Sequence, residues 1–347
     1  MRIFLVITKS DLGGAQSVVV NIANLLVAKH DVTVIAGEGG QMWKQLDSRV
    51  RQIYLPYLLR KIGWRDIFVW GKLLMLYIKY RPDVVHLHSS KIGLLGRFAF
   101  PKRKVVYTVH GFDSIRVAFR TFLKLEKATS ARVSKYFAVS NYDSRNLALE
   151  GVCSKPITIY NGISDVSANK APVEADILQG DTRFKVLCIA RLAAPKRFDL
   201  FCDVAKSLPS VSFYWIGNSE EVKDVPSNVR MMGEIINASV MFKYADVCML
   251  PSDFEGFPMS IIEAKACGIP AVASNVGGIS EMLDGENGFV VKNTVEDFTE
   301  KIRYYQNDKV AYEEACKKAR ASYEQNFTSM KMALEYEKIY TQISKPL

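Results

Sequence analysis

Two carboxylates and two cations in the second half of the sequence have the types and spacing to bind a phosphorylated sugar. Arg191 and Lys196 follow a predicted strand, and Glu255 and Glu263 both lie in the segment 251–270. Arginine binds a diphosphate as a planar fork, and lysine binds it as a point charge. A carboxylate accepts hydrogen bonds from hydroxyl groups. The alternatives are solvated loop charges for the two cations and an ordinary surface carboxylate for Glu263.

Helix signals around these carboxylates predict a helix that starts at an anion. Pro258 stands where a helix would begin, and Gly268 stands where it would stop. The first backbone N–H groups of a helix lack partners within it and favour a phosphate. Glu255 precedes this start and can accept hydrogen bonds from sugar hydroxyls, whereas Glu263 lies within the helix and can reach a ribose diol. Its apolar neighbours make burial of Glu263 without a partner costly.

Residues in the first half of the chain also follow predicted strands. Gly13 and Gly14 lie between the first strand and a helix, where glycines let the backbone approach a phosphate. A plain tight turn is the alternative. His110 ends another strand at the sheet edge where ligands bind, although a lone histidine is often structural. We interpret His86 and His88 as core and edge residues, because no third metal ligand accompanies them.

Short apolar runs alternate with helical patterns along the whole chain. This alternation predicts parallel sheets covered on both faces by helices. The predicted strands are Ile3–Thr8, Val32–Ala36, Val84–His88, Val105–Val109, Tyr136–Val139, Ile157–Tyr160, Val186–Ile189, Ser212–Ile216, Val229–Met232, Val247–Leu250 and Ala271–Ala273. We therefore predict an α/β protein with two domains, 1–163 and 183–326, an irregular linker at 164–182 and a closing helix within 327–347.

Cysteine usage and hydropathy indicate the cellular compartment of the protein. The six cysteines form no Cys-x-x-Cys pair, which indicates neither a zinc site nor a disulfide framework and favours a reducing cytosol. The first apolar run is too short for a signal peptide. The apolar run 67–78 is too short to cross a bilayer. We expect a cytoplasmic protein without a membrane-spanning segment.

Positive charge is concentrated in the first half. Residues 1–160 carry a net charge of +15 and residues 161–347 a net charge of −5. This asymmetry favours an anionic partner, either nucleic acid or a membrane surface. We expect no nucleic acid, because no recognition module is evident. The cations expected on the surface are Arg60, Lys61, Arg65, Lys72, Lys79, Arg81, Lys102, Arg103, Lys104, Arg116, Arg120, Lys124 and Lys127.

Four of these cations fall at helical spacing. Arg116, Arg120, Lys124 and Lys127 would form a stripe on one helix face, for which an ordinary solvated face is the alternative. Together with the aromatic, apolar segment 67–80, the stripe favours peripheral contact with an anionic membrane, on the inner face of the plasma membrane.

These residues together resemble family 4 of the retaining glycosyltransferases, which adopt the GT-B fold. The resemblance covers nearly the whole chain, and the two glutamates in a Glu-x7-Glu arrangement are its most specific feature. The motifs that carry it are Gly13-Gly14-Ala15-Gln16, Val84 to His88, Thr108 to Gly111, Val139-Ser140, Ile159 to Ile163, Arg191 with Lys196, Glu255 with Glu263, and Gly277-Gly278 to Glu281.

The resemblance implies two facing Rossmann-like domains, the first binding the acceptor and the second the nucleotide sugar, with a C-terminal helix that returns to the first. Arg191 and Lys196 would bind the donor diphosphate, and Glu263 the ribose. Glu255 would hold the donor sugar. The other implied contacts are Gly13 and Gly14 with the diphosphate, Gly256, Phe257 and Pro258 with the donor sugar, and His110 beside the reacting centre.

The implied reaction transfers a hexose or N-acetylhexosamine from a nucleotide-diphosphate sugar to a hydroxyl of a glycan or a polyprenyl-diphosphate-linked acceptor, in cell-surface polysaccharide synthesis. A UDP-sugar is favoured over GDP-mannose, and neither a cofactor nor a metal is expected. Two departures from the family pattern flank the phosphate cations, Ala190 and Arg197, where glycines are usual. The alternatives are a nucleotide-sugar 2-epimerase and a non-catalytic protein that binds anionic surfaces.

Overall fold

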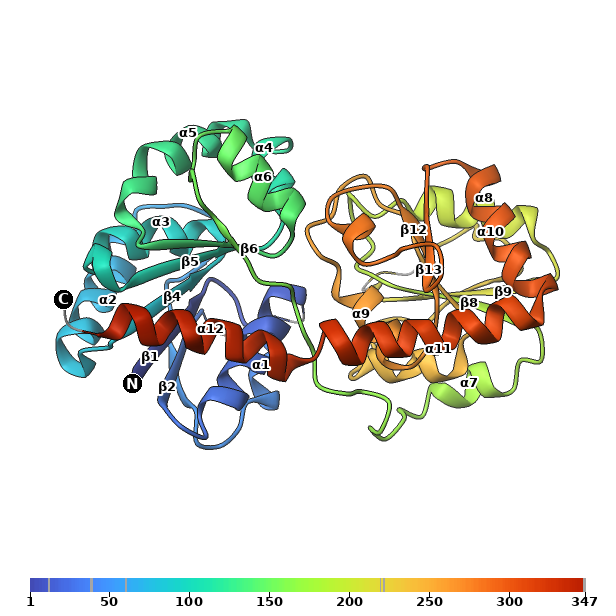
Figure 1. Cartoon of the computed structure of the whole chain (residues 1–347), viewed down its shortest axis with the longest axis horizontal. Coiled ribbons are helices and arrows are strands. Elements are labelled where there is room, and N and C mark those ends of the chain that lie inside the picture. The colour runs from blue at the N-terminus through green and yellow to red at the C-terminus, as the bar shows by residue number, and fades with distance from the viewer. Residues whose placement is uncertain (12, 38–39, 60, 219, 221, 346–347) are drawn as a thin grey trace. The chain divides into compact units, whose positions relative to one another are not determined.

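Two parallel sheets organise the chain, one in each of two units. The computed structural model describes residues 1–11, 13–37, 40–59, 61–218, 220 and 222–345. Unit 1 comprises residues 1–163 and 329–347, and unit 2 comprises residues 164–328 (Figure 1). Each unit places helices on both faces of its sheet, which confirms the predicted α/β class with two Rossmann-like domains.

The sheet of unit 1 has the strand order β3-β2-β1-β4-β5-β6-β7, and all its pairs are parallel. Its strands are β1 (Arg2–Ile7), β2 (Asp31–Ala36), β3 (Arg51–Tyr54), β4 (Val84–His88), β5 (Val105–Val109), β6 (Lys135–Ala138) and β7 (Ile157–Thr158). Its helices are α1 (Gly14–Leu26), α2 (Asp66–Tyr80), α3 (Ser90–Ala99), α4 (Asp113–Arg116), α5 (Arg120–Thr129), α6 (Asn141–Leu149) and α12 (Ser329–Ser344).

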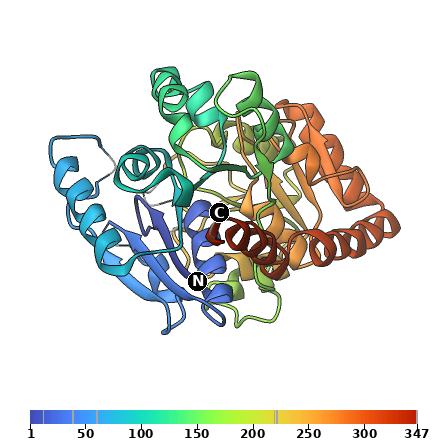
Figure 2. The ribbon, with the colours of Figure 1, turned by 60° about the vertical axis from the view of Figure 1, so that its left-hand side comes forward.

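The side chains of β4 alternate between the two faces of the sheet, so that this strand packs against both helix layers of unit 1. Val85 and Leu87 belong to the apolar cluster that includes the inner face of α2. His86 points to the opposite face, where its ring contacts Tyr336 and Tyr340 of α12. The last helix therefore packs into the first unit, beside α1, as Figures 1 and 2 show.

The sheet of unit 2 has the strand order β10-β9-β8-β11-β12-β13 and is also parallel. Its strands are β8 (Phe184–Ile189), β9 (Val211–Ile216), β10 (Val229–Met231), β11 (Val247–Leu250), β12 (Ala271–Ser274) and β13 (Gly288–Val291). Its helices are α7 (Ala175–Gln179), α8 (Phe198–Ser207), α9 (Met259–Ala266), α10 (Val295–Asn307) and α11 (Lys309–Asn326).

Three local predictions differ from the structure. The strands β3 and β13 were not predicted, because β3 is an edge strand with an exposed Arg51 and β13 begins at Gly288. The segment 164–182 was expected to be irregular, but it contains α7. The cationic stripe is interrupted, since Arg116 ends α4 and a new helix starts at Arg120. Among the described residues no helix combines the length and hydropathy needed to span a membrane.

Each sheet reverses its strand order at one point. In unit 1 the chain runs outward from β1 to β3 and then restarts beside β1 with β4, and in unit 2 it restarts beside β8 with β11. Ligands of open parallel sheets bind outside the carboxyl ends of the strands at such switch points. The loops that follow β1, β4, β8 and β11 are therefore the candidates for a site.

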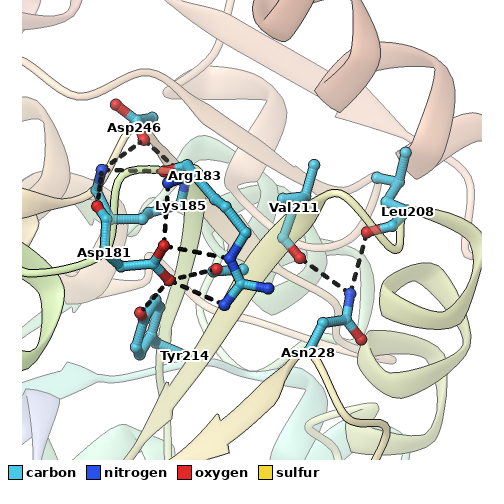
Figure 3. A network of polar contacts seen from close by, with 9 residues as sticks. Asp181, Arg183, Lys185, Leu208, Val211, Tyr214, Asn228 and Asp246 are labelled. Carbon is cyan, nitrogen blue, oxygen red and sulfur yellow. Dashed lines mark hydrogen bonds and ion pairs between the residues drawn. The ribbon is translucent and has the colours of Figure 1, made fainter.

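A polar network closes the opposite, amino-terminal edge of the unit 2 sheet (Figure 3). Asp181 accepts hydrogen bonds from Ser212, from Tyr214 (2.7 Å) and from Arg183. Burial opposes ionisation of Asp181, but these hydrogen bonds hold its pKa well below the ordinary range. A cavity of about 510 Å³ adjoins this network. Because the polar groups satisfy one another, we assign the network to joining the starts of β8 and β9.

The network makes a prediction for stability. Replacing Asp181 by Asn should lower the free energy of unfolding of unit 2 by about 1–3 kcal/mol at pH 7, because buried donors lose a charged acceptor. A depressed carboxyl pKa stabilises the fold above the unfolded pKa of 3.8. The difference between the variant and the natural protein should therefore shrink below about that pH. Urea unfolding followed by the ¹⁹F signal of fluorotryptophan at Trp215 measures it, and a difference that does not change with pH would contradict the assignment.

Candidate functional site

Two loops leave the carboxyl edge of the unit 2 sheet at its switch point and are joined to each other. Loop 190–197 follows β8, and loop 251–258 follows β11. Lys196 forms an isolated antiparallel bridge with Ser252. The flanking backbone hydrogen bonds run from Arg197 N to Pro251 O (3.1 Å) and from Asp253 N to Pro195 O (3.0 Å). Backbone pairing thus holds the cations of one loop beside the carboxylate of the other.

The ammonium group of Lys196 forms an ion pair with the carboxylate of Glu255. Ser252 Oγ donates a hydrogen bond of 2.7 Å to Glu255 Oε1. The two side chains are only 20% and 11% exposed, and charges in such surroundings need partners. The structure thus brings together two residues that the sequence placed on different parts of a ligand. Glu255 compensates the charge of Lys196, so an incoming anion would have to share the Lys196 ammonium group with Glu255.

The two arginines of loop 190–197 differ in their partners. Arg197, a departure from the family pattern, pairs with Asp199 (2.6 Å) and Asp253 (3.3 Å). Arg191 is exposed and forms no ion pair with any described residue. Arg191 is therefore the cation of this loop that is available to an anion.

Two glycines fix the shape of these loops. Gly277 has φ 57°, and a Cβ atom there would lie 1.7 Å from the carbonyl oxygen of Glu255. Gly278 N donates to Gly256 O (3.0 Å). Gly217 has φ 111°, and its Cβ would lie 2.6 Å from the oxygen of Ala190. Both loops are backed by backbone that tolerates only glycine. Gly217 was missed from the sequence, where its position directly after a predicted strand was the available signal.

Helix α9 begins after Pro258, as predicted. Pro258 is its N-cap and supplies no side-chain hydrogen bond to the helix start. The Phe257 side chain is buried, and its ring centroid lies 5.6 Å from that of Phe327. Phe257 therefore anchors the loop in the core, and the backbone N–H groups at the start of α9, from Met259 onward, are the candidates for contact with a ligand.

Glu263 lies on α9 as a partly buried carboxyl group. Its side-chain oxygens form no hydrogen bond or ion pair with the residues that the structure describes. Burial among apolar neighbours raises the pKa of Glu263 from 4.5 to about 7. The carboxyl group is therefore divided between its neutral and ionised forms near neutral pH, and hydroxyl donors from a ligand would favour ionisation.

The corresponding loop of unit 1 follows β1. Thr8 Oγ1 is 2.7 Å from Ser89 Oγ, which joins the carboxyl ends of β1 and β4. Gly13 is the N-cap of α1 in an extended conformation, and the first turn from Gly14 carries no acidic residue. A helix start of this kind favours an anion. Leu12, which belongs to this motif, lies outside the described residues.

A chain of buried histidines leads to His110. His88 Nδ1 is 2.9 Å from His110 Nε2, and His86 contacts Thr108 (2.6 Å) and Tyr340 (2.5 Å). Burial lowers the pKa of all three imidazoles, that of His110 to about 4. The histidines are neutral at pH 7. The interpretation of His86 and His88 as core and edge residues did not predict the contact of His88 with His110; their two-residue spacing indicated only that they share one face of the sheet.

Comparison with known proteins identifies the family. Residues 12–166 match Glycosyltransferase Family 4, and residues 183–308 match Glycosyl transferases group 1. The chain belongs to glycosyltransferase family 4. It is 28% identical over 320 residues to the O-antigen biosynthesis glycosyltransferase WbnH of Escherichia coli, covering 89% of this chain and 91% of that protein.

A second relative from Escherichia coli is UDP-Gal:alpha-D-GlcNAc-diphosphoundecaprenol alpha-1,3-galactosyltransferase. It is 28% identical over 336 residues, which cover 86% of each chain. Among solved structures, Anabaena HepE in complex with UDP-glucose matches with a TM-score of 0.86 at 19% identity, over 99% of this chain and 100% of that chain. These likenesses confirm the GT-B fold.

The raised pKa of Glu263 makes a prediction for stability. An unfolded glutamate ionises near pH 4.5 and the folded one near pH 7, so the free energy of unfolding should fall as the pH rises through this window. Glu263→Gln removes this contribution. The variant should become progressively more stable than the natural protein between pH 4.5 and 7, with no further change above. Urea unfolding at several pH values measures it, and two curves of equal pH dependence would refute the raised pKa.

The contact between His88 and His110 predicts their tautomers. His88 Nε2 is buried without a hydrogen-bond partner among the described residues. If His110 donated to His88 Nδ1, the neutral His88 would carry its proton on Nε2, as a buried donor without a partner. Orphaned buried N–H groups are rarer than orphaned acceptors. His88 Nδ1–H is therefore expected to donate, which leaves the neutral His110 protonated on Nδ1.

Long-range ¹H–¹⁵N spectra of labelled imidazoles test this tautomer. The natural protein should show His110 protonated on Nδ1. His88→Asn retains a donor near the same place and should keep that tautomer, whereas His88→Phe should shift His110 toward Nε2–H. A natural protein with His110 protonated on Nε2 would contradict the expected direction of donation.

Proposed function

We propose that this glycosyltransferase retains the anomeric configuration of its donor and needs no metal. The donor is a UDP-sugar carrying a hexose or N-acetylhexosamine, with GDP-mannose as the second candidate. The acceptor is a hydroxyl of a glycan or of a polyprenyl-diphosphate-linked sugar at an anionic membrane, in cell-surface polysaccharide synthesis. The observation that carries this proposal is the Lys196–Glu255 ion pair beside the start of α9 at the switch point of unit 2.

The ion pair suits the junction between a diphosphate and a sugar. Lys196 and the exposed Arg191 would neutralise the diphosphate, while the N–H groups at the start of α9 bind its oxygens. Glu255 would accept hydrogen bonds from the sugar hydroxyls, beside the backbone of Gly256–Pro258. Glu263 would accept those of the ribose. The family resemblance adds Gly13 and Gly14 for phosphate contact and His110 for contact with the reacting sugar.

In the proposed step the bond between the anomeric carbon and the β-phosphate oxygen breaks, and the acceptor oxygen bonds to the same face of that carbon. The acceptor proton passes to an oxygen of the departing diphosphate, so no protein base is required. Negative charge develops on the leaving group. Lys196, held by its ion pair with Glu255, and the start of α9 are fixed before reaction, and together with Arg191 they stabilise this charge without a metal.

Two comparisons support the donor and acceptor classes. HepE forms a complex with UDP-glucose, and the galactosyltransferase relative is named for a UDP-galactose donor and a diphosphoundecaprenol-linked acceptor. WbnH is named for O-antigen biosynthesis. The exposed guanidinium of Arg191 and the unpartnered Glu263 carboxyl group fit two adjacent parts of a uridine diphosphate, its diphosphate and its ribose.

A panel of UDP- and GDP-sugars tests the proposal, with nucleotide release followed with and without a lipid-linked acceptor. Release should require the acceptor, survive EDTA and give a product with the donor's anomeric configuration, as read from proton coupling constants. Conversion of the donor without an acceptor would indicate an epimerase instead. Loss of activity in EDTA would overturn the metal-independent mechanism.

Removing the paired cation tests its role. Lys196→Ala should reduce kcat/KM about 10²-fold or more, because the leaving diphosphate loses a fixed positive charge. Lys206→Ala is the matched control, since Lys206 is an exposed lysine of α8 paired with Asp203, and its kcat/KM should not change. Circular dichroism and thermal unfolding check that both variants fold. An unchanged kcat/KM in folded Lys196→Ala would remove this residue from the mechanism.

A further inference from the structure

Exposed apolar side chains are concentrated in one part of unit 1. Among its described residues, unit 2 exposes four large apolar side chains at scattered positions, Val173, Ile236, Tyr304 and Val310. The segment 57–78 alone exposes nine: Tyr57, Leu59, Ile62, Trp64, Ile67, Phe68, Trp70, Met75 and Ile78. Single exposed apolar residues are ordinary, but a contiguous group marks an interaction surface.

The loop that precedes α2 is held in place with its apolar side chains outward. Lys91, which is buried, donates to the carbonyl oxygens of Leu59 (2.7 Å) and Lys61 (2.6 Å) and pairs with Asp66 (2.6 Å). Asp66 also accepts from Gly63 N (3.0 Å). A buried cation thus binds this loop from beneath. The exposure of its apolar side chains is built into the fold.

Helix α2 is apolar on both of its faces. Its inner face packs Val69, Leu73 and Leu76 into the core of unit 1. Its outer face exposes Ile67, 65% accessible, with Phe68, Met75 and Ile78. A helix that is apolar all round is normally buried. We therefore expect another molecule to cover the outer face of α2.

Loop and helix form one surface. The Phe68 ring lies 6.0 Å from Tyr57 and 5.9 Å from Trp64, measured between centroids. Ile62 lines a small pocket together with Phe122 and Leu125 of α5, which extends the surface to that helix. The loop follows β3 and therefore lies at the carboxyl edge of the unit 1 sheet. His110, which follows β5, lies at the same edge.

The charges around this surface select its partner. The exposed cations of the segment 61–81 are Lys61, Arg65, Lys72, Lys79 and Arg81, and α5 adds Arg120 and Lys124. Asp66, the acidic residue of that segment, is buried in its pair with Lys91. Arg60 lies outside the described residues. A second copy of the chain would bring like charges together, whereas anionic lipid offers the opposite charge and an apolar interior.

We propose that residues 57–59 and 61–68 and the outer face of α2 dock onto an anionic lipid surface, with the aromatic and aliphatic side chains inserted at the interface and the flanking cations on lipid phosphates. This surface is the membrane contact that the proposed function requires. The docking proposal rests on the proposed function only in assigning a lipid-linked acceptor to that membrane. The carboxyl edge that bears His110 then lies near the membrane, where a lipid-linked sugar is presented.

The fluorescence of Trp64, 74% exposed, reports the docking, with Trp64→Phe as the reference for the emission of the other three tryptophans. With vesicles of phosphatidylcholine and phosphatidylglycerol, its emission should shift to shorter wavelength and be quenched by brominated acyl chains, without donor or acceptor present. The double variant Ile67→Asn/Phe68→Asn should weaken partitioning about tenfold or more, because two apolar side chains leave the interface. Lys72→Glu/Lys79→Glu should weaken binding to these vesicles by a similar factor.

Val310→Asn is the matched control, since Val310 is 79% exposed on α11 of unit 2, and its partitioning should equal that of the natural protein. Equal binding of neutral and anionic vesicles, or no loss in the Ile67/Phe68 variant, would overturn the proposal. So would sedimentation velocity showing that this variant disrupts a dimer rather than vesicle binding. If the protein bound vesicles but transferred no sugar, these readouts would not change. The docking proposal and the proposed function can therefore fail independently of each other.

Discussion

The parallel pairing of β8 with β11 is the constraint on which the candidate site depends. Val186 and Val247 lie opposite each other in these strands, although they are far apart in the sequence. This register brings the two following loops to one edge, where Lys196 can bridge to Ser252 and pair with Glu255. The strand order reverses there, and ligands of open parallel sheets bind at such switch points.

Charge at this edge is only partly balanced within unit 2. Lys196 and Glu255 neutralise each other, whereas Arg191 and the carboxyl group of Glu263 have no charged or hydrogen-bonding partner among the described residues. The Asp181 network at the opposite edge satisfies its own groups. A polar group that is buried without a partner carries a free-energy penalty that a ligand can relieve, which applies to the partly buried Glu263. This contrast distinguishes the candidate binding edge of the sheet from the opposite edge.

Much of this arrangement could be predicted from sequence. Continuous apolar runs located β4, β5 and β11 with their observed bounds, and helix signals located the start of α9 at Pro258. Features that depend on tertiary contact could not be predicted. The edge strand β3 lacks an apolar run, the Lys196–Glu255 pair joins distant loops, and Arg116 and Arg120 show helical spacing across a break between two helices. The periodicity of apolar residues predicts each helix or strand separately, whereas the site depends on how the strands pair.

We infer that a nucleotide diphosphate binds at the carboxyl edge of the unit 2 sheet. Titration of the ²H,¹⁵N-labelled chain with UDP, followed by the backbone amide resonances, is the direct test of this inference. The largest shifts are expected at Arg191, Lys196 and the first residues of α9, with no change around Asp181 and Arg183 at the amino edge. Shifts confined to the amino edge, beside the cavity of about 510 Å³, would contradict it.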